Sequence, residues 1–556
     1  MKKQFIMYFL LLAGIGVFAQ TEVEKGMAAI TPEAVKGQLE FLASDWTEGR
    51  AVGTKGEYIA ADYIASMFQV YGIKPFGDAG MPAMTGRRRM MSENMGPLPK
   101  TYFQSFSLIQ YEPGDEQTFS VISTTAGSES SIDFGYKTDF FVRTGTVGQT
   151  TKAPLVFVGY GFEDNEKGYS DFAKINLKGK IAVVLSGFPG SRDTASVAYK
   201  KFAPQDRMAR FSIERNKAEK LEKAGAIAII QVNPNADPMA GWAQNQIYPA
   251  KGQHYEADKP LRTYYDTSMS MPSDSLTGNI ATFTVTTRLV NEILKGTGLN
   301  IAGFEKTVAE KMQPASRELA GKMVAFRTTV KSEVLKVRNV IGYIEGEKKD
   351  EFIVVGGHYD HLGKWDGYIW NGADDNGSGT VGVMTIAKAF AATGKKPEKS
   401  VIFAAWTGEE KGLFGSKYFV QDAMKKKMNI VLNLNYDMIA RDETNDTLKN
   451  KADMSYTKAY PGIEELTKKN LADYKINLDM DYSASEKPSG GSDHAPFAAV
   501  GIPIFYFMAA MHPDYHQPSD ELSKINWEKM TNIIRIGFLN TWEFANSNQY
   551  LQKETK

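Results

Sequence analysis

The sequence predicts an α/β fold: a mostly parallel mixed sheet flanked by helices, with a β-rich region ahead of it. Three observations lead to this fold class. After Arg338, apolar runs of strand length alternate with stretches of helical periodicity. These runs are continuous rather than alternating with polar residues, which is typical of parallel strands that helices cover on both faces. Ahead of them, the composition shifts toward strand-like segments, among them 153–161 and 178–185, and this shift indicates a β-rich region.

The first nineteen residues have the features of a signal peptide. Lys2 and Lys3 precede an apolar run from Phe5 to Phe18, and Ala19 follows it. The run is shorter than the roughly 20 apolar residues that a membrane-spanning helix needs. We therefore expect cleavage after Ala19, an exported protein that is periplasmic or secreted, and no stable membrane anchor.

Residues 20–136 are expected to form the N-terminal part of the main domain. Thr31 and Pro32 favour a helix start, because Thr is a good N-cap and Pro suits the first helical position. A second helix is predicted from Lys55 to Tyr71, and strands are predicted over 101–125 and 134–142.

Residues 137–290 are expected to form the inserted domain, and residues 291–556 the main part of the large domain. The inserted domain has predicted strands at 153–161, 178–185, 226–231 and 280–286, a helix at 212–224 and a long loop or lid at 236–275. The main part has predicted strands at 340–344, 351–356, 400–406, 430–436 and 502–507, and predicted helices at 379–392, 412–422, 462–470 and 527–546.

Composition excludes several classes of function. Lys+Arg and Asp+Glu number 65 each, so the formal net charge is zero. Because nucleic-acid binding needs an excess or a stripe of basic residues, we expect no nucleic-acid partner. The sequence has no Cys, which excludes thiol catalysis, disulfide bonds and thiolate metal sites.

Polar residues that suit a metal site follow the ends of the predicted strands. They are His358 and Asp360 after 351–356, Glu409 and Glu410 after 400–406, Asp437 after 430–436, and Tyr515 and His516 beyond 502–507. Asp375 lies at the predicted start of a helix. In open α/β sheets, ligands bind beyond the carboxyl ends of the strands, so we expect these side chains to converge. Nitrogen and carboxylate ligands without sulfur suit zinc, and two ions can share one carboxylate.

Six ordered motifs resemble those of family 28 of the metallopeptidases, which contains secreted bacterial zinc aminopeptidases and is related to glutamate carboxypeptidase. They are Gly357-His358-Tyr359-Asp360, Gly372 to Gly379, Gly408-Glu409-Glu410-Lys411-Gly412, Asn435-Tyr436-Asp437-Met438, Ser492-Asp493-His494 and Tyr515-His516. Glu48-Gly49-Arg50 resembles the opening of these catalytic domains. Residues 137–290 resemble the protease-associated domain that is often inserted into them. The resemblance implies a zinc exopeptidase-like fold.

The resemblance also implies two Zn²⁺ ions per chain and a role for each site residue. His358, Asp375 and Asp437 would hold one ion, Glu410 and His516 would hold the second, and Asp375 would bridge both. Glu409 would be the general base, Tyr515 would hydrogen-bond the oxyanion, and Asp360 would orient His358 by accepting its other ring proton. A cis peptide bond is expected between Asp375 and Asn376.

Several neighbouring residues have alternative interpretations. Asp374 competes with Asp375 for the bridging position. We expect His361, His494 and Asp493 to support the site without binding metal, His254 and His512 to lie at the surface, and Arg441 to form a structural ion pair.

The predicted activity is that of an exopeptidase acting on peptides, and most closely that of an aminopeptidase. Three alternatives stay open: a carboxypeptidase, a single-zinc glutaminyl cyclase on the same fold, and a catalytically inactive binding protein. The complete set of ligand candidates disfavours the last two. A carboxypeptidase would need a cationic pocket for the substrate carboxylate.

Overall fold

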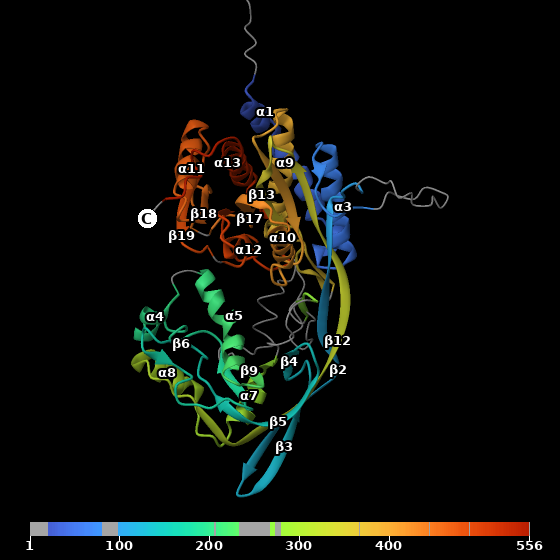
Figure 1. Ribbon diagram of the computed structural model, residues 1–556. Coiled ribbons are helices and arrows are strands. Elements are labelled where there is room, and N and C mark those ends of the chain that lie inside the picture. Colours follow the sequence, from blue (N-terminus) through green and yellow to red (C-terminus); the bar gives the residue numbers. More distant parts are fainter. Residues whose placement is uncertain are drawn as a thin grey trace, which may run out of the picture.

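Two lobes share one mixed sheet in the computed structural model of the chain (Figure 1). The structure describes residues 20–80, 98–204, 207–232, 267–272, 280–365, 367–443, 445–488 and 490–554. The predicted signal peptide, His254 and most of the predicted loop at 236–275 lie outside these residues. The main path of the sheet runs in the order β19-β18-β20-β17-β13-β16-β12-β5-β8-β9-β11-β4.

The first lobe contains the part of the sheet from β19 to β16 and the helices that cover it. Its strands are β13 (Lys348–His358), β16 (Lys399–Trp406), β17 (Asn429–Tyr436), β18 (Lys451–Thr457), β19 (Asp479–Ser485) and β20 (Ile504–Met508). The strands β16, β13, β17 and β20 pair in parallel, as the continuous apolar runs predicted. Strands β18 and β19 were missed, because both are partly exposed and alternate apolar with polar residues.

Helices cover both faces of this part of the sheet. They are α1 (Glu22–Ala29), α2 (Pro32–Leu42), α3 (Lys55–Val70), α9 (Gly379–Thr393), α10 (Phe414–Lys425), α11 (Gly462–Asp473), α12 (His494–Ala499) and α13 (Trp527–Asn546). One core packs α2, α3, α9, α11 and α13 against Ile353 and Val355 of β13. The other core packs α10 and α12 against Val354 of the same strand. Successive residues of a strand point to opposite faces, which is why one apolar run serves two cores.

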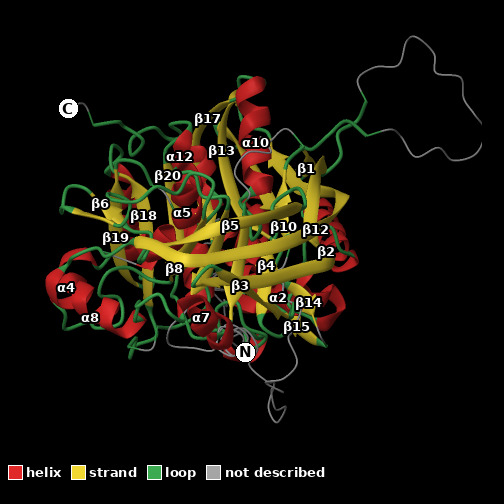
Figure 2. Ribbon diagram, turned by 90° about the horizontal axis from the view of Figure 1, so that it is seen from below, coloured by secondary structure: helices red, strands yellow, loops and turns green. Residues whose placement is uncertain are grey.

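The second lobe carries the rest of the sheet and its own apolar core. Its elements are β3 (Ser128–Phe134), β4 (Phe140–Arg143), β5 (Gln149–Phe157), β8 (Ile181–Leu185), β9 (Ala228–Val232), β11 (Ala281–Val285), α4 (Val197–Phe202), α5 (Arg207–Lys223), α7 (Thr287–Leu294) and α8 (Ile301–Lys311). Strands β5 and β8 run across the direction of β13 and β17 (Figure 2). The core of this lobe draws residues from Phe119 to Phe326, a wider span than the predicted bounds 137–290.

Two long strands join the lobes. β2 (Phe103–Thr125) and β12 (Arg317–Ile344) pair antiparallel along most of their length, with a register shift between Thr328 and Val330. The sequence predicted only residues 340–344 of β12, because the preceding stretch alternates buried with exposed, often charged, residues. A strand with one exposed face lacks the continuous apolar run that marks a fully buried strand.

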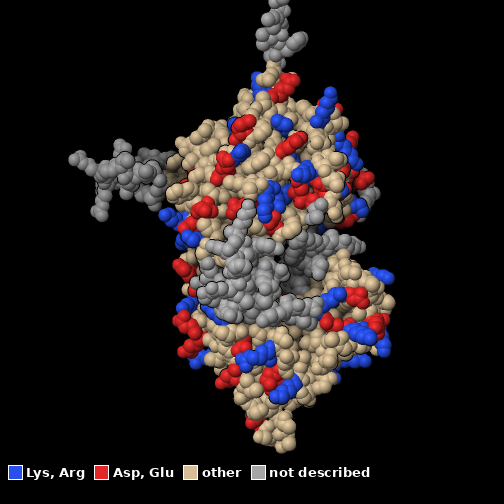
Figure 3. Space-filling model, turned by 180° about the vertical axis from the view of Figure 1, so that it is seen from behind, with Lys and Arg blue, Asp and Glu red and all other residues tan. Residues whose placement is uncertain are grey.

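The fold class predicted from the sequence is confirmed: it is a mixed sheet flanked by helices. Among the described helices, none has the length and apolar character needed to cross a membrane. On the face shown in Figure 3, acidic and basic side chains are interspersed over both lobes, in keeping with the equal numbers of the two signs in the sequence.

Candidate metal centre

The predicted site residues converge at the carboxyl edge of the parallel strands. His358 is the last residue of β13, Glu409 and Glu410 follow β16, and Asp437 follows β17 directly. Asp375 lies in the short kinked helical segment η3 (Ala373–Ser378) that leads into α9. His516 lies in the loop after β20. Parallel strands end at one edge of a sheet, so residues that are far apart in the chain meet there.

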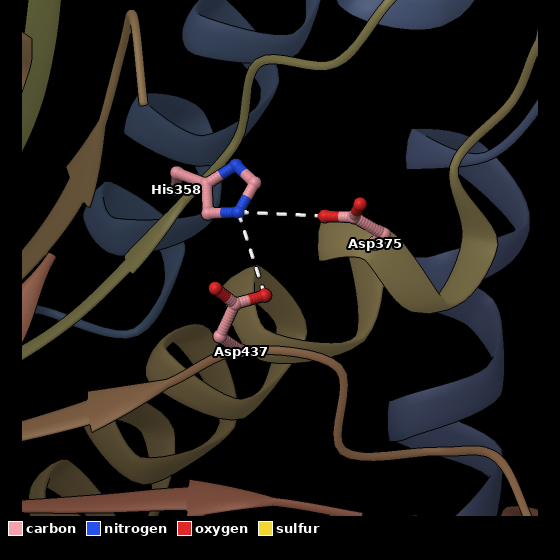
Figure 4. A group of neighbouring side chains, drawn as sticks. All are labelled: His358, Asp375 and Asp437. Carbon is pink, nitrogen blue, oxygen red and sulfur yellow. Dashed lines mark ion pairs between the residues drawn. The ribbon is translucent and has the colours of Figure 1, made fainter. Parts of the chain in front are cut away.

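A first group of donors is formed by His358, Asp375 and Asp437 (Figure 4). The Nε2 atom of His358 is 3.5 Å from Oδ1 of Asp375 and 3.5 Å from Oδ1 of Asp437. All three side chains are buried. The Nδ1 atom of His358 is 3.1 Å from the backbone oxygen of Asp360. A carbonyl oxygen only accepts, so Nδ1 of His358 carries a proton and Nε2 is the ring atom that faces the two carboxylates.

A second group of donors surrounds the other oxygen of Asp375. The Nε2 atom of His516 is 3.1 Å from Oδ2 of Asp375 and 3.1 Å from Oε2 of Glu410. His361 approaches Glu410 from the opposite side, with its Nδ1 atom 2.7 Å from Oε1. Four of the five predicted ligands are buried or nearly so, and the side chain of His516 is 14% exposed.

Distances separate ligand candidates from hydrogen-bond partners. Two ligands at 2.0–2.2 Å from one tetrahedral zinc ion are roughly 3.3–3.6 Å apart. The contacts of His358 and His516 with the carboxylates, at 3.1–3.5 Å, are close to this separation. The 2.7 Å contact of His361 is instead a hydrogen bond, in which Nδ1–H donates to Glu410 and holds its carboxylate in place. The sequence analysis expected such a supporting position for His361.

The carboxylate of Asp375, rather than that of Asp374, lies between the two groups of donors. Oδ2 of Asp375 is buried and accepts no hydrogen bond from any described residue, while the Nε2 atom of His516 lies 3.1 Å from it. Such an orphaned carboxylate oxygen, in a set of nitrogen and oxygen donors, fits a divalent metal ion. Asp374 turns away, because its Oδ1 accepts the backbone N–H of Ala440 at 2.7 Å. The peptide bond between Asp375 and Asn376 is cis, as expected.

One sequence expectation near this loop is wrong. His512 was placed at the surface, but it is 4% exposed, and its Nε2 atom is 3.2 Å from Oδ2 of Asp374. The residue follows β20 in a segment that folds back over the η3 loop, and a lone His in a loop gives no signal for such a contact. The expected ion pair of Arg441 is present, with Asp514 at 2.6 Å.

Asp360 holds the loop that carries the two glutamates. Its Oδ1 accepts the backbone N–H of Glu409 at 3.1 Å, and its Oδ2 accepts that of Glu410 at 3.4 Å. The carboxylate is 3.7 Å from Nδ1 of His358, farther than the backbone oxygen of the same residue. Asp360 was expected to accept the ring proton of His358, and in the structure its backbone oxygen is the acceptor, whereas its carboxylate orients Glu409 and Glu410.

The two adjacent glutamates have opposite electrostatic environments. Burial raises the pKa of Glu409 well above its ordinary value, and nearby Glu410, Asp493 and Asp437 raise it further, against the opposing effect of His358. Burial also acts to raise the pKa of Glu410, but His516 and His361 outweigh it and hold that pKa well below its ordinary value. The surroundings of Glu410 therefore favour its charged form, and those of Glu409 favour its protonated form. Pairs of carboxyl groups with diverging pKa values are typical of acid–base sites.

Aromatic residues flank the second group of donors. The ring of Tyr515 stacks on His516, with centroids 3.8 Å apart, and Trp370 donates its indole N–H to the backbone oxygen of His516 at 3.3 Å. Tyr506 of β20 was not singled out from the sequence. Burial raises its pKa well above the ordinary value, and the carboxylates of Asp437, Glu409 and Asp375 raise it further. Tyr506 lies within the apolar run that predicted the strand 502–507, so it was not recognised as a site residue.

The comparison with protein families covers this part of the chain. Residues 339–538 match the family model described as Peptidase family M28. These residues form a peptidase family M28 domain. All ligand candidates of both donor groups, from His358 to His516, lie within the M28 domain.

Individual proteins that resemble this chain match only part of it. A glutamate carboxypeptidase 2 homolog of Caenorhabditis elegans is 25% identical over 405 residues, which are 64% of this chain and 48% of that protein. A probable leucine aminopeptidase of Trichophyton verrucosum is 31% identical over 212 residues, 36% of this chain and 56% of that protein. Aminopeptidase YwaD of Bacillus subtilis is 26% identical over 242 residues, 42% and 49% respectively. These alignments span about half the length of each relative.

Solved structures share the fold over nearly the whole chain. An aminopeptidase from Aneurinibacillus sp. strain AM-1 aligns with a TM-score of 0.56 at 19% identity, covering 96% of this chain and 98% of that one. A zinc aminopeptidase from Bacillus subtilis aligns with a TM-score of 0.50 at 18% identity, covering 94% and 96%. At these identities the likeness establishes the architecture around the M28 domain.

Proposed function

We propose that this protein is an exported di-zinc exopeptidase that removes N-terminal residues from peptides. One observation carries the proposal: the two oxygens of Asp375 face two different histidines, with Oδ1 3.5 Å from His358 and Oδ2 3.1 Å from His516. A carboxylate placed in this way can bridge two metal ions. The names of the relatives and of the solved structures support an aminopeptidase.

The five predicted ligands fit the two ions. His358, Asp375 and Asp437 would hold one Zn²⁺, and Asp375, Glu410 and His516 would hold the other. When bound, the ions supply Lewis acidity, which favours loss of a proton from water and polarises the scissile carbonyl group. The second group of donors also includes His361, which we assign to holding Glu410 because of its short contact.

Glu409 would move the protons of the reaction. Its raised pKa suits a group that takes a proton from water and returns it to the leaving amine. The backbone of Glu409 is held by Asp360, which limits the freedom of the carboxylate. Tyr515, next to His516, would donate a hydrogen bond to the oxyanion that forms on the substrate.

A carboxypeptidase is the second candidate, because one relative bears that name. Such an enzyme needs a cationic group that faces the substrate carboxylate. Of the cations close to the donor groups in the described parts of the chain, Arg50 is bound to backbone carbonyls and Arg441 to Asp514. Lys411 donates to Thr267, and Lys417 donates to the backbone oxygen of Gly412. All four are engaged, which favours an aminopeptidase.

Hydrolysis of a panel of peptides distinguishes these activities. The panel contains free, N-blocked and C-blocked peptides, each with and without a chelator, and zinc is counted by elemental analysis of the pure protein. We expect two zinc ions per chain and chelator-sensitive cleavage that needs a free N-terminus. Cleavage that needs a free C-terminus would indicate the carboxypeptidase. One ion with cyclisation of N-terminal Gln would indicate the cyclase, and no zinc with no turnover would indicate the binding protein.

Export and the role of the second lobe are parts of the same proposal. The charged start and apolar run of residues 1–19 support cleavage after Ala19. N-terminal sequencing of the protein made by its natural host should begin at Gln20, and an intact Met1 in the exported fraction would contradict cleavage. We propose that the second lobe is a protease-associated domain.

A further inference from the structure

Two buried residues, Arg50 and Asp520, hydrogen-bond to the backbone that leads to Asp375. Neither has a role in the proposed chemistry. Residues 371–375 enter the metal centre through Gly372, whose φ is 55°, a conformation that favours glycine. Two carbonyl groups of this segment accept hydrogen bonds from Arg50, and three N–H groups donate to Asp520. Each of the five residues 371–375 is therefore bound by Arg50 or Asp520. The side chains of these two residues bind four of the five, and the backbone oxygen of Asp520 binds Ala373.

Arg50 is bound entirely to main-chain oxygens. It is fully buried, and its Nη1 and Nη2 atoms donate to the oxygens of Asn371 at 2.7 Å and Gly372 at 3.0 Å. Nε donates to the oxygen of Tyr359 at 2.7 Å, directly between His358 and Asp360, and Nη1 also reaches the end of α2 at Leu42. A planar guanidinium is suited to hold several carbonyl groups in fixed directions. One residue thus joins the loop after β13 to the segment that carries Asp375.

Asp520 holds the same segment from the opposite end of the chain. Its backbone oxygen accepts the N–H of Ala373 at 3.1 Å. Its Oδ2 accepts the N–H groups of Asp374 and Asp375, each at 3.0 Å. Asp520 is fully buried, and Arg441 lies 3.6 Å from its Oδ1. Because Asp520 is four residues after His516, it fixes the spacing between the loops that carry two of the ligand candidates.

We propose that Arg50 and Asp520 are positioning residues that together set the Asp375 carboxylate between the two metal positions. The inference rests on the proposed di-zinc function. A bridging carboxylate must place each of its oxygens within a few tenths of an ångström of the right position. The segment 371–375 has no strand or regular helix to hold it, so the two buried side chains supply the hydrogen bonds that a regular element would make.

The inference is tested with variants at both positions and a control in the second lobe. Asp520→Ala removes both carboxylate acceptors, and Asp520→Asn keeps one. Arg50→Lys keeps the charge but cannot span four carbonyl groups. Asp171→Ala is the matched control, because Asp171 is also a buried aspartate whose Oδ2 accepts two backbone N–H groups, those of Tyr160 and Phe162. All are made in the full chain.

Two readouts are measured on each variant. The first is hydrogen exchange of the backbone of residues 371–379 in the metal-free protein, and the second is zinc affinity from competition with a chelating dye. We expect exchange of this segment to rise at least about tenfold in Asp520→Ala and Arg50→Lys, and less in Asp520→Asn. We expect zinc affinity to fall about 10- to 100-fold, the usual effect of losing a residue that orients a ligand. Asp171→Ala should leave both readouts unchanged.

The outcomes separate the inference from the proposed function. Wild-type exchange and zinc affinity in Asp520→Ala and Arg50→Lys would overturn the positioning role. A wild-type protein that binds no zinc would overturn the di-zinc function, and exchange of the metal-free segment would still decide whether the two residues hold it. If Asp520→Ala does not fold, Asp520→Asn and Arg50→Lys decide: raised exchange with weaker zinc binding supports the inference, and unchanged values contradict it.

Discussion

Two buried aspartates, Asp171 in the second lobe and Asp375 in the first, have opposite hydrogen-bonding environments. In the second lobe, Asp171 accepts the N–H groups of Tyr160 at 3.0 Å and Phe162 at 3.1 Å and the hydroxyl of Tyr169 at 2.9 Å. In the first lobe, Oδ2 of Asp375 accepts no hydrogen bond from any part of the chain that the structure describes. A buried carboxylate with a purely structural role is given donors, whereas one that is left without them is typical of a site that takes a cation.

The surroundings of the two carboxylates differ in the same way. Asp171 lies among apolar and aromatic side chains in the core of the second lobe, with the ammonium group of Lys217 as a nearby charge. Asp375 lies close to Asp437 and Glu410: His358 contacts both Asp375 and Asp437, and His516 contacts both Asp375 and Glu410. Crowded like charges in a buried site cost free energy, which a pair of divalent cations would offset. This difference in surroundings therefore distinguishes a structural aspartate from a metal-binding one. Three predictions test the distinction.

The largest expected effect separates the two adjacent glutamates. Glu409→Gln should lower kcat by about 10²- to 10⁴-fold and keep both zinc ions, because the side chain moves a proton in the proposed reaction. Glu410→Gln should lose zinc, because the residue is a proposed ligand. Steady-state kinetics and elemental analysis of the two purified variants check this. Retained turnover in Glu409→Gln, or equal zinc loss in both variants, would contradict the proposal that Glu409 moves the proton and Glu410 binds the metal.

Removal of metal should destabilise the first lobe and spare the second. A ligand that binds only the folded state at 100 times its Kd stabilises that state by about 2.7 kcal/mol. We expect a chelator to lower the unfolding temperature of the wild type, measured by calorimetry. The Asp375→Asn variant is the control and should unfold at the same temperature with and without chelator. An equal chelator effect on wild type and Asp375→Asn would contradict a metal centre at this residue.

The pH dependence of Asp171 gives the third prediction. Burial raises the pKa of Asp171 from 3.8 to about 6, so the folded protein holds this proton more tightly than the unfolded chain. The group therefore stabilises the fold below about pH 4, and this contribution, at most ~3 kcal/mol, is lost as the pH rises to about 6. Asp171→Asn has no such proton.

The measurement is urea unfolding of the wild type and Asp171→Asn at several pH values. The destabilisation caused by Asp171→Asn should be larger at pH 4 than at pH 7. Activity and zinc content of the variant should equal those of the wild type. A destabilisation that is independent of pH would mean that Asp171 is ionised throughout and is held by its donors alone.

The sequence by itself predicted the fold class and the residues that converge. Continuous apolar runs predict parallel strands, and a polar residue directly after such a run must lie at the carboxyl edge of the sheet. His358, Glu410 and Asp437 could be placed by this rule alone. Asp375 and His516 were also expected at this edge, although a turn and a loop carry them, and the motif resemblance then implied their roles as metal ligands.

Only the tertiary structure decided which groups hold these residues in place. The burial of His512 against Asp374, the carbonyl groups held by Arg50, and the N–H groups held by Asp520 all join segments that are distant in sequence. The same is true of the long strand β12, whose exposed face conceals it in the sequence. Periodicity and strand ends are local properties of a chain, so they are visible in its residues. A hydrogen-bond partner that lies hundreds of residues away is fixed only when the segments pack together.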